Sequence, residues 1–354
     1  MNSKERMLNL FKGGEVDCIP AAPHWWGMYK FQLAGLTSGY ENESKCWDLQ
    51  GAALADVDTL FYETFRPDSF HLNSGSWRYH DKARADRYWE LRTRLKALES
   101  KSFIDEYIGV MYAKADEVIK SGTYDHVKIL SEKYRESVFI TMNEGNPVCD
   151  ILDPQGPFGF EEGLIALVEK PEMMEYLFFR EYEMYLERMK ALKVCGCHGY
   201  IGSETYCSTD LISPSTYRDV IFPAHKYFYE KVREIGLVPI VYFLGEIIPL
   251  MDYINRMGVT ALLVEEPKKG YSLDVVEIRK KLNEEITLFG NLDSVYTMLY
   301  GNSNDVRNET LNQLEASKYG RFVMANGCPI AFNTPKDNIL AMIETAHSTA
   351  GGRA

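Results

Sequence analysis

The sequence lacks the segments that would carry a protein into or across a membrane. No apolar run approaches the length of about 18 residues that a membrane-spanning helix needs. The first residues, MNSKERMLNLFKGG, have the pattern of a charged amphipathic helix without the apolar centre of a signal peptide. The seven cysteines are scattered and form no even framework. We therefore expect free thiols in a reducing, cytoplasmic compartment.

Positive charge is also scarce. The 39 lysines and arginines are outnumbered by 51 aspartates and glutamates, which gives a formal charge of −12. An acidic chain is poorly suited to a phosphate backbone or an anionic bilayer, so we expect neither nucleic acid nor membrane as a main partner. Glycine-rich phosphate loops of the two common kinds are missing after the expected strands, which disfavours a doubly wound nucleotide-binding sheet.

The second half of the chain alternates short apolar runs with longer helical patterns. The units repeat roughly every 25–40 residues, which indicates a parallel sheet and favours a (β/α)8 TIM barrel. The helix expected at 213–234 should kink at Pro223. The expected strands are 199–202, 238–243, 260–264, 286–289 and 322–325, and the other expected helices are 248–256, 273–282, 304–317 and 335–345.

The first half is less regular. Residues 19–23 and 57–61 have the composition of strands. Residues 81–122 are highly charged with helical periodicity, which predicts an inserted helical cap. No linker rich in proline, glycine or serine interrupts the chain, so we expect a single domain over residues 1–354.

Three stretches together carry a resemblance to a known family. They read GPFGFEEGLIALVEKPEMMEYL (156–177), DLISPSTYRDVIFPAHK (210–226) and LFGNLDSVYTMLYGNSNDVRNETLNQLEASKYGRFVMANGCPIAFNTPKDNILAMIETA (288–346). In order and spacing they resemble the uroporphyrinogen decarboxylase family, which includes the decarboxylase and the cobamide-dependent methyltransferases built on the same barrel. The resemblance implies a TIM barrel, and the first half of the chain matches only loosely.

Departures from the family patterns separate its two branches. The decarboxylase carries an arginine-rich segment after the first strand to hold an acidic tetrapyrrole, whereas residues 23–29 here read PHWWGMY. The zinc methyltransferases carry His-x-Cys at a later strand end, where this chain has Tyr242 and Leu244, and only Cys328 of the implied zinc set remains. A single thiolate does not make a zinc site, so zinc would need other ligands here.

Function in such a barrel sits at the carboxyl ends of the strands, and this rule selects the candidate residues. Glu204 and Glu246 are candidate acids, and Tyr242 could donate a hydrogen bond. A metal could be held by Cys328 with Glu204, Glu246 and His225. We expect Cys328 to share one pocket with Glu204, Tyr242 and Glu246. The candidate substrate-binding residues are Trp25, Trp26, Tyr29, Asn291 and Asp293; the ordinary alternative for all these residues is core packing or loop capping.

One apparent metal motif is set aside. Cys195-Gly196-Cys197-His198 lies between a helix and the next strand, at the amino-terminal face where these barrels rarely do chemistry. Cys18 is set aside on the same ground, and Cys207 stays open.

The leading hypothesis is a methyltransferase that moves a methyl group between a small methylated substrate and the corrinoid of a partner protein. An acid or a metal ion would help the leaving group depart. Two alternatives remain: a decarboxylase-like enzyme acting on a less acidic substrate, and a barrel that binds a tetrapyrrole or corrinoid without chemistry.

Overall fold

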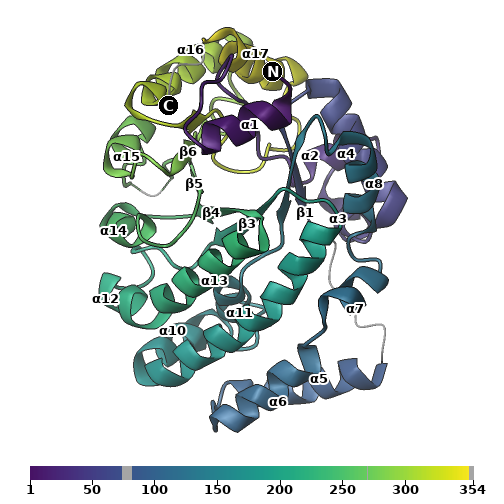
Figure 1. The fold of residues 1–354 in the computed structure, drawn as a ribbon, viewed down its shortest axis with the longest axis vertical. Helices are drawn as coiled ribbons and strands as arrows, with labels where there is room; N and C mark the ends of the chain where they lie inside the picture. Colours follow the sequence, from purple (N-terminus) through teal and green to yellow (C-terminus); the bar gives the residue numbers. More distant parts are fainter. Residues whose placement is uncertain (74–81, 269, 351–354) are drawn as a thin grey trace.

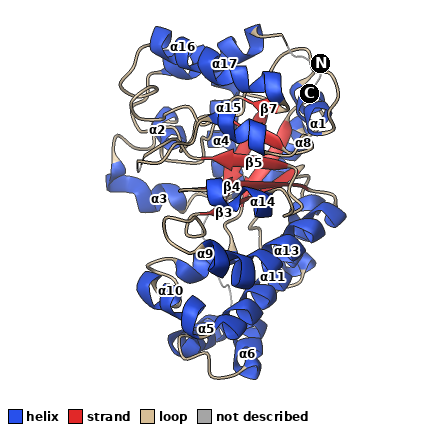
Figure 2. Cartoon of the chain, turned by 90° about the vertical axis from the view of Figure 1, so that its left-hand side faces the viewer, coloured by secondary structure: helices blue, strands red, loops and turns tan. Residues whose placement is uncertain are grey.

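The computed structural model describes residues 1–73, 82–268 and 270–350. Seven parallel strands form one sheet in chain order, and each strand pairs with the next. The sheet curls, with helices around it (Figure 1, Figure 2). This architecture agrees with the α/β TIM barrel that the sequence predicts. The strands are β1 (Ser69–Asn73), β2 (Phe139–Asn143), β3 (Gly199–Glu204), β4 (Val238–Phe243), β5 (Ala261–Val264), β6 (Thr287–Phe289) and β7 (Phe322–Val323).

A short segment near the N-terminus fills the gap between the last strand and the first. Ala21 forms a parallel bridge with Met324, and the Met324 N–H donates to the Pro20 carbonyl at 2.8 Å. On the other side, the Asp68 N–H donates to the Ala21 carbonyl at 2.8 Å. The segment expected as a strand at 19–23 therefore stands in the eighth position of the ring, although it pairs only through single bridges.

The helices are α1 (Ser3–Phe11), α2 (Tyr29–Leu33), α3 (Glu43–Trp47), α4 (Gly51–Phe65), α5 (Lys82–Leu95), α6 (Lys101–Met111), α7 (Ala115–Lys120), α8 (Asp125–Tyr134), α9 (Pro147–Leu152), α10 (Phe160–Glu169), α11 (Pro171–Val194), α12 (Pro214–Thr216), α13 (Phe222–Ile235), α14 (Met251–Ile254), α15 (Val275–Lys281), α16 (Ser303–Leu314) and α17 (Lys336–Ser348). Helices α1 to α4 precede β1, and the other helices lie between or after the strands. Short 3-10 turns, η1 (Tyr40–Asn42), η3 (Ile248–Leu250) and η4 (Glu315–Tyr319), adjoin some of them. Within the described residues, no helix is both long and apolar enough to span a bilayer.

The strand expected at 57–61 is wrong. These residues lie inside α4, whose buried side chains include Leu54, Val57 and Phe61. They recur at helical spacing, so the apolar run is one face of a helix. The first strand is β1, which buries four of its five residues.

The helix expected at 213–234 is interrupted before its proline, not at it. A π-helical turn, η2 (Tyr217–Ile221), separates α12 from α13. Pro223 stands in the first turn of α13, where its missing N–H costs no helical hydrogen bond. The π turn takes up one extra residue before it, a form that recurs at functional sites.

The helical insertion lies between β1 and β2. The helical cap expected at 81–122 corresponds to helices α5, α6 and α7. Residue 81 lies outside the described residues. Figure 1 shows α5 and α6 beside the end of α11 that lies far from both termini. Asp105 of α6 accepts hydrogen bonds from Tyr176 and Arg180 of α11, both at 2.8 Å. The insertion is therefore fixed to α11.

Alternation along the strands sorts side chains between two layers. Ile201, Ile240 and Tyr242 belong to the cluster inside the barrel. Tyr200 and Phe243, their neighbours in sequence, belong to the larger cluster between the strands and the outer helices. Any polar residue on a strand can therefore be assigned to a layer by its position.

Candidate active site at the barrel mouth

Tyr242 points into the barrel and meets the loop that follows β7. Its hydroxyl donates a hydrogen bond to the Gly327 carbonyl at 2.6 Å and lies 3.7 Å from the Cys328 sulfur. Tyr242 is buried, whereas Cys328 is partly exposed. The expected convergence of these two residues at the carboxyl ends of the strands is therefore present.

Gly327 allows this loop to approach β5. A Cβ at this position would lie 2.2 Å from the Glu266 nitrogen and 2.3 Å from its carboxylate oxygen Oε2. Glycine is therefore needed for close approach rather than for a left-handed backbone angle. The Glu266 carboxylate is buried beside the loop, and this burial raises its pKa.

Lys268 brings a positive charge to the thiol. Its Nζ lies 2.7 Å from the Cys328 sulfur and 3.1 Å from the Glu266 carboxylate. Burial, followed by the Glu266 charge, raises the pKa of the Cys328 thiol to about 11, although Lys268 and Tyr242 act in the opposite direction. Burial disfavours the charge of Lys268, but Cys328 and Glu266 outweigh it and raise the lysine pKa. The group is therefore a thiol beside an ammonium ion.

Two buried histidines complete the polar lining. The His24 ring lies 4.8 Å from the His71 ring and 5.1 Å from the Tyr242 ring, between centroids. Neither His24 ring nitrogen has a hydrogen-bond partner among the described residues. Burial lowers the pKa of His24 to about 3 and also lowers that of His71, so both rings are neutral near pH 7. They act as aromatic walls.

Glu204 does not share this pocket, which corrects the expectation. In the parallel register Ser203 stands beside Tyr242, and Glu204 stands beside Phe243. Glu204 therefore points outward, toward α13, where the Tyr229 hydroxyl donates to its Oε1 at 3.0 Å. There it meets His225, whose Nε2 lies 3.3 Å from Glu204 Oε2.

Glu246 lies at the rim, in the loop after β4. Its carbonyl accepts from the Thr209 N–H at 2.9 Å, and its N–H donates to Asp210 Oδ1 at 3.2 Å. Its partly exposed carboxylate lies 3.4 Å from the Thr209 hydroxyl. Glu246 therefore joins the loops after β3 and β4, and its hydrogen bonds within the described part of the chain go to Thr209 and Asp210, not to Cys328 or Glu204.

Asn291 and Asp293 serve loop structure in the described contacts. The Asn291 amide donates to the Glu265 and Leu273 carbonyls at 3.0 and 2.8 Å. Asp293 accepts from the N–H groups of Val295 and Tyr296. Asn291 and Asp293 also line a side cavity of about 270 Å³, together with Leu273, Gln313 and others, so a ligand contact there stays a prediction.

The aromatic residues after the eighth position are divided between layers. Trp25 is fully buried and stacks on Phe61 of α4 with ring centroids 3.9 Å apart. Tyr29 is buried against Phe61 and Phe65. These two side chains pack the barrel against α4, and their expected contact with a substrate stays a prediction. Trp26 is partly exposed, and its role stays a prediction.

The mouth does not fit the zinc site that the family resemblance implies. Tyr242 stands in place of one ligand, and the Lys268 ammonium lies against Cys328. In the described part of the chain, the one convergent group of three metal-ligating side chains is Glu204, Cys207 and His225. The four predicted metal ligands therefore do not converge. Glu204 and His225 lie together in the layer between strands and helices, whereas Cys328 lies at the mouth.

The cysteines set aside from the sequence are buried at the opposite end. Cys197 donates through its sulfur to the carbonyls of Ile140 and Gly199 at 3.3 and 3.1 Å. Cys195 caps α11 and is also buried. This placement fits a structural role.

Sequence reasoning missed three residues of the mouth, each for an identifiable reason. His24 directly follows the segment at the eighth position, so the strand-end rule that selected Trp25 also applied to it. His71 was missed because the strand expected after residues 19–23 was placed at 57–61, inside α4, whereas the strand is β1. Lys268 stands four residues beyond the end of β5 in the run Glu265-Glu266-Pro267-Lys268, so the strand-end rule selects Glu265 before it.

The chain forms a (β/α)-barrel. Its candidate site lies at the carboxyl ends of the strands, where enzymes with this fold carry their active sites. The profile of the family described as Uroporphyrinogen decarboxylase (URO-D) matches residues 114–349. The chain belongs to this family.

The individual relatives share only about a quarter of their residues with this chain over the matched segments. The chain is 26% identical to the Methylated-thiol--coenzyme M methyltransferase of Methanosarcina mazei over 157 residues, which is 44% of this chain and 39% of the relative. It is 26% identical to Methylcobamide:CoM methyltransferase MtaA of Methanosarcina barkeri over 216 residues, or 59% of this chain and 61% of the relative. The matches thus span less than two thirds of these relatives.

A solved structure supports the fold over the whole chain. A methyltransferase from Methanosarcina mazei superposes with a TM-score of 0.73 and 18% identity, covering 98% of each chain. At this identity the likeness concerns the fold alone.

Proposed function

We propose that this protein is a methyltransferase that moves a methyl group between a small methylated substrate and the corrinoid of a partner protein. The observation that carries the proposal is the Cys328, Lys268 and Tyr242 cluster at the mouth of a barrel whose relatives include methylcobamide:CoM methyltransferases. The absence of arginine from residues 23–29 supports a small substrate over an acidic tetrapyrrole.

Lys268 has the central chemical role in this proposal. When the methyl group leaves the substrate, the bond between the methyl carbon and its heteroatom breaks, and the heteroatom keeps the electron pair and takes up a proton. The Lys268 ammonium is a donor placed at the mouth for this step. A reduced corrinoid, when bound, would supply the electron pair for the new bond to the methyl carbon.

Other residues of the mouth position the reacting groups. Tyr242 holds the Gly327 carbonyl and thereby the loop that presents Cys328. The neutral rings of His24 and His71 line the mouth with aromatic surface. Glu246 at the rim is the second candidate acid.

The test is methyl transfer with free corrinoids, followed by visible absorbance. Reduced cobalamin is offered methoxylated aromatics, methylamines or methylated thiols, and methylcobalamin is offered thiol acceptors. We expect transfer with one of these classes, reduced at least tenfold in Lys268→Met and unchanged in Lys226→Met, a partly exposed lysine of α13 paired with Glu230. No transfer with any class, together with decarboxylation of uroporphyrinogen, would reverse the proposal in favour of the decarboxylase alternative.

A further inference from the structure

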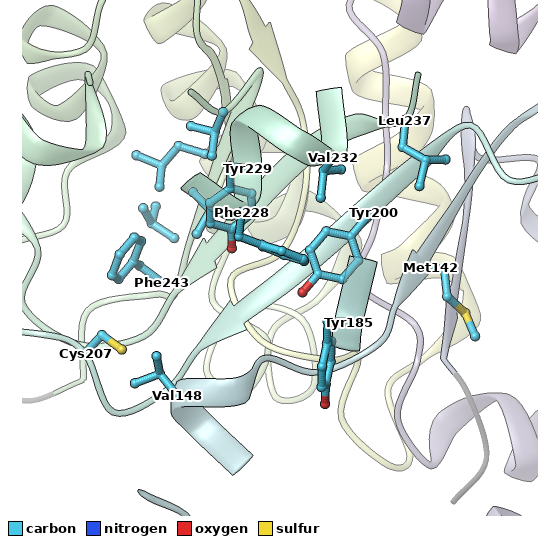
Figure 3. Close-up of a cluster of buried hydrophobic side chains, with 14 of the residues drawn as sticks. Met142, Val148, Tyr185, Tyr200, Cys207, Phe228, Tyr229, Val232, Leu237 and Phe243 are labelled. Atoms are coloured by element: carbon cyan, nitrogen blue, oxygen red, sulfur yellow. The ribbon is translucent and has the colours of Figure 1, made fainter. Parts of the chain in front are cut away.

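A second group of reactive side chains lies inside the barrel wall, away from the mouth. Glu204 ends β3, Cys207 follows in the next loop, and His225 belongs to the first turns of α13. All three side chains are fully buried. Figure 3 shows Cys207, Tyr229 and Phe243 in the same buried cluster between strands and helices. The mouth chemistry described above uses none of them.

The three ligand atoms converge on one point. Glu204 Oε2 lies 3.3 Å from the Cys207 sulfur and 3.3 Å from His225 Nε2, and all three atoms lie within 4.8 Å of one another. In tetrahedral zinc sites the metal–ligand distances of about 2.0–2.3 Å place ligand atoms roughly 3.3–3.6 Å apart. The two separations from Glu204 Oε2 lie in this range, and the bound of 4.8 Å on the third keeps all three atoms around one point, as binding of an ion between them requires.

The remaining polar atoms of two of these residues are held by other partners. Glu204 Oε1 accepts hydrogen bonds from Asn146 at 2.5 Å and Tyr229 at 3.0 Å. His225 Nδ1 lies 3.1 Å from the Tyr217 hydroxyl. His225 Nε2, which is aimed at Glu204, is buried and has no hydrogen-bond partner among the described residues. Such outer contacts fix the orientation of ligands in metal sites.

The charge of the group also favours a cation. In the described part of the chain, His225 is the only ion-pair partner of Glu204. A buried carboxylate is costly unless it is paired or bound to a metal. Thiolate, imidazole and carboxylate together form a donor set that zinc accepts.

We propose that Glu204, Cys207 and His225 form a zinc site in the barrel wall. The ion would tie the end of β3 and its following loop to α13, directly after the π-helical turn η2. The site is separate from the mouth, and the proposal does not rest on methyl transfer. A buried ion pair between Glu204 and His225 without metal is the competing reading.

The first test is the zinc content of protein grown with added zinc and purified without chelator. We expect about one zinc per wild-type chain, and an affinity at least tenfold lower in Cys207→Ser and His225→Gln. Cys197→Ser, at the opposite end of the barrel, and Cys328→Ser should retain the metal. Absence of metal from the wild type, even after reloading with zinc, would establish the ion-pair reading.

A second test does not depend on the folding of the site variants. Cobalt(II) is loaded into the Cys328→Ser protein, in which the mouth cysteine cannot ligate. We expect a sulfur-to-cobalt charge-transfer band and, for the zinc form, X-ray absorption with one sulfur neighbour. A metal bound to wild type but lost in Cys328→Ser would move the site to the mouth and overturn the proposal. Neither measurement depends on activity, so this proposal and the proposed function can fail separately.

Discussion

Glu204 and Tyr242 lie on neighbouring strands one position out of register, and this single step sends their side chains to opposite faces of the barrel wall. Tyr242 meets Cys328 inside the mouth, and Glu204 meets Cys207 and His225 outside it. The chain thus carries two polar clusters that each contain a thiol, Cys328 inside the barrel mouth and Cys207 in the layer between strands and helices.

The Cys328 thiol should react first with an alkylating agent. Six of the seven cysteines are buried, and Cys328 is the partly exposed one. Since its pKa is raised to about 11, the alkylation rate should rise with pH between 8 and 10 as the thiolate forms. Lys268 lowers this pKa, so Lys268→Met should slow labelling at a given pH. Mass spectrometry of iodoacetamide-treated protein measures both effects. Lys226→Met is the control, and faster labelling of Lys268→Met would contradict the assigned contact.

Tyr242→Phe should destabilise the protein through its loop. The substitution removes the donor to the Gly327 carbonyl and leaves that carbonyl unpaired, which costs about 1–3 kcal/mol in a buried setting. Urea unfolding gives the difference in the free energy of unfolding. Tyr296→Phe, at a side chain that is 78% exposed, should change it by less than about 0.5 kcal/mol. Equal stability of the two variants would show that the hydroxyl contact is absent.

The buried, neutral His24 ring should make the free energy of unfolding fall as the pH is lowered. Burial holds its pKa at about 3 in the folded state, below the ordinary value of 6.5 in the unfolded chain. The unfolded state therefore binds more protons between these values, and the stabilisation present above pH 6.5 is lost as the pH falls toward 3.

His24→Phe tests this contribution, because phenylalanine keeps an aromatic ring that does not titrate. Between pH 6 and 4 the free energy of unfolding should fall less steeply with acid, by up to about 1.4 kcal/mol per pH unit. The slope, measured by urea unfolding at several pH values, is the readout. Tyr29→Phe should keep the wild-type slope, and an unchanged slope in His24→Phe would place that ring in contact with solvent.

Asp68→Asn should open the eighth position of the ring. The buried Asp68 carboxylate accepts from the Ala21 N–H at 2.8 Å, pairs with Arg6 and lies 2.7 Å from His347 Nε2. Removing one charge of a buried pair costs about 3–5 kcal/mol, which thermal or urea unfolding would detect. Asp219→Asn, in an exposed pair with Arg218, should cost less than about 1 kcal/mol. A similar small loss for both variants would refute the closing role of Asp68.

The barrel could be predicted because its signals are local and repeated. Each βα unit of the second half combines an apolar run with a helical pattern, and Ser213 before Pro214 marks a helix start that the structure contains. Strand β1 could not be placed from such signals. The helix α4 offers a denser apolar run than β1, and periodicity alone cannot separate a buried strand from one helix face over five residues.

The site was only partly predictable. The strand-end rule places a residue at the carboxyl end of the barrel, but it does not say whether the side chain points into the barrel or outward to the helices. Cys328 and Tyr242 follow the rule and converge. Glu204 also ends a strand, yet its outward face depends on a register that appears only when β3 is paired with β4. Lys268 could have been selected by its place after β5, but only the folded loop shows that it meets the thiol.

The segment at the eighth position has a consequence for how this chain folds during synthesis. Its backbone is held by residues some three hundred positions later: Asn326 accepts from the His24 N–H, and Met324 bridges Ala21. Contacts of such sequence separation slow folding, because a long loop must close before they form. On the ribosome, the strands β1 to β6 emerge while the ring still has an open edge. The ring can close only when β7 has left the exit tunnel, so a nascent chain shortened before Phe322 should expose this edge to chaperones.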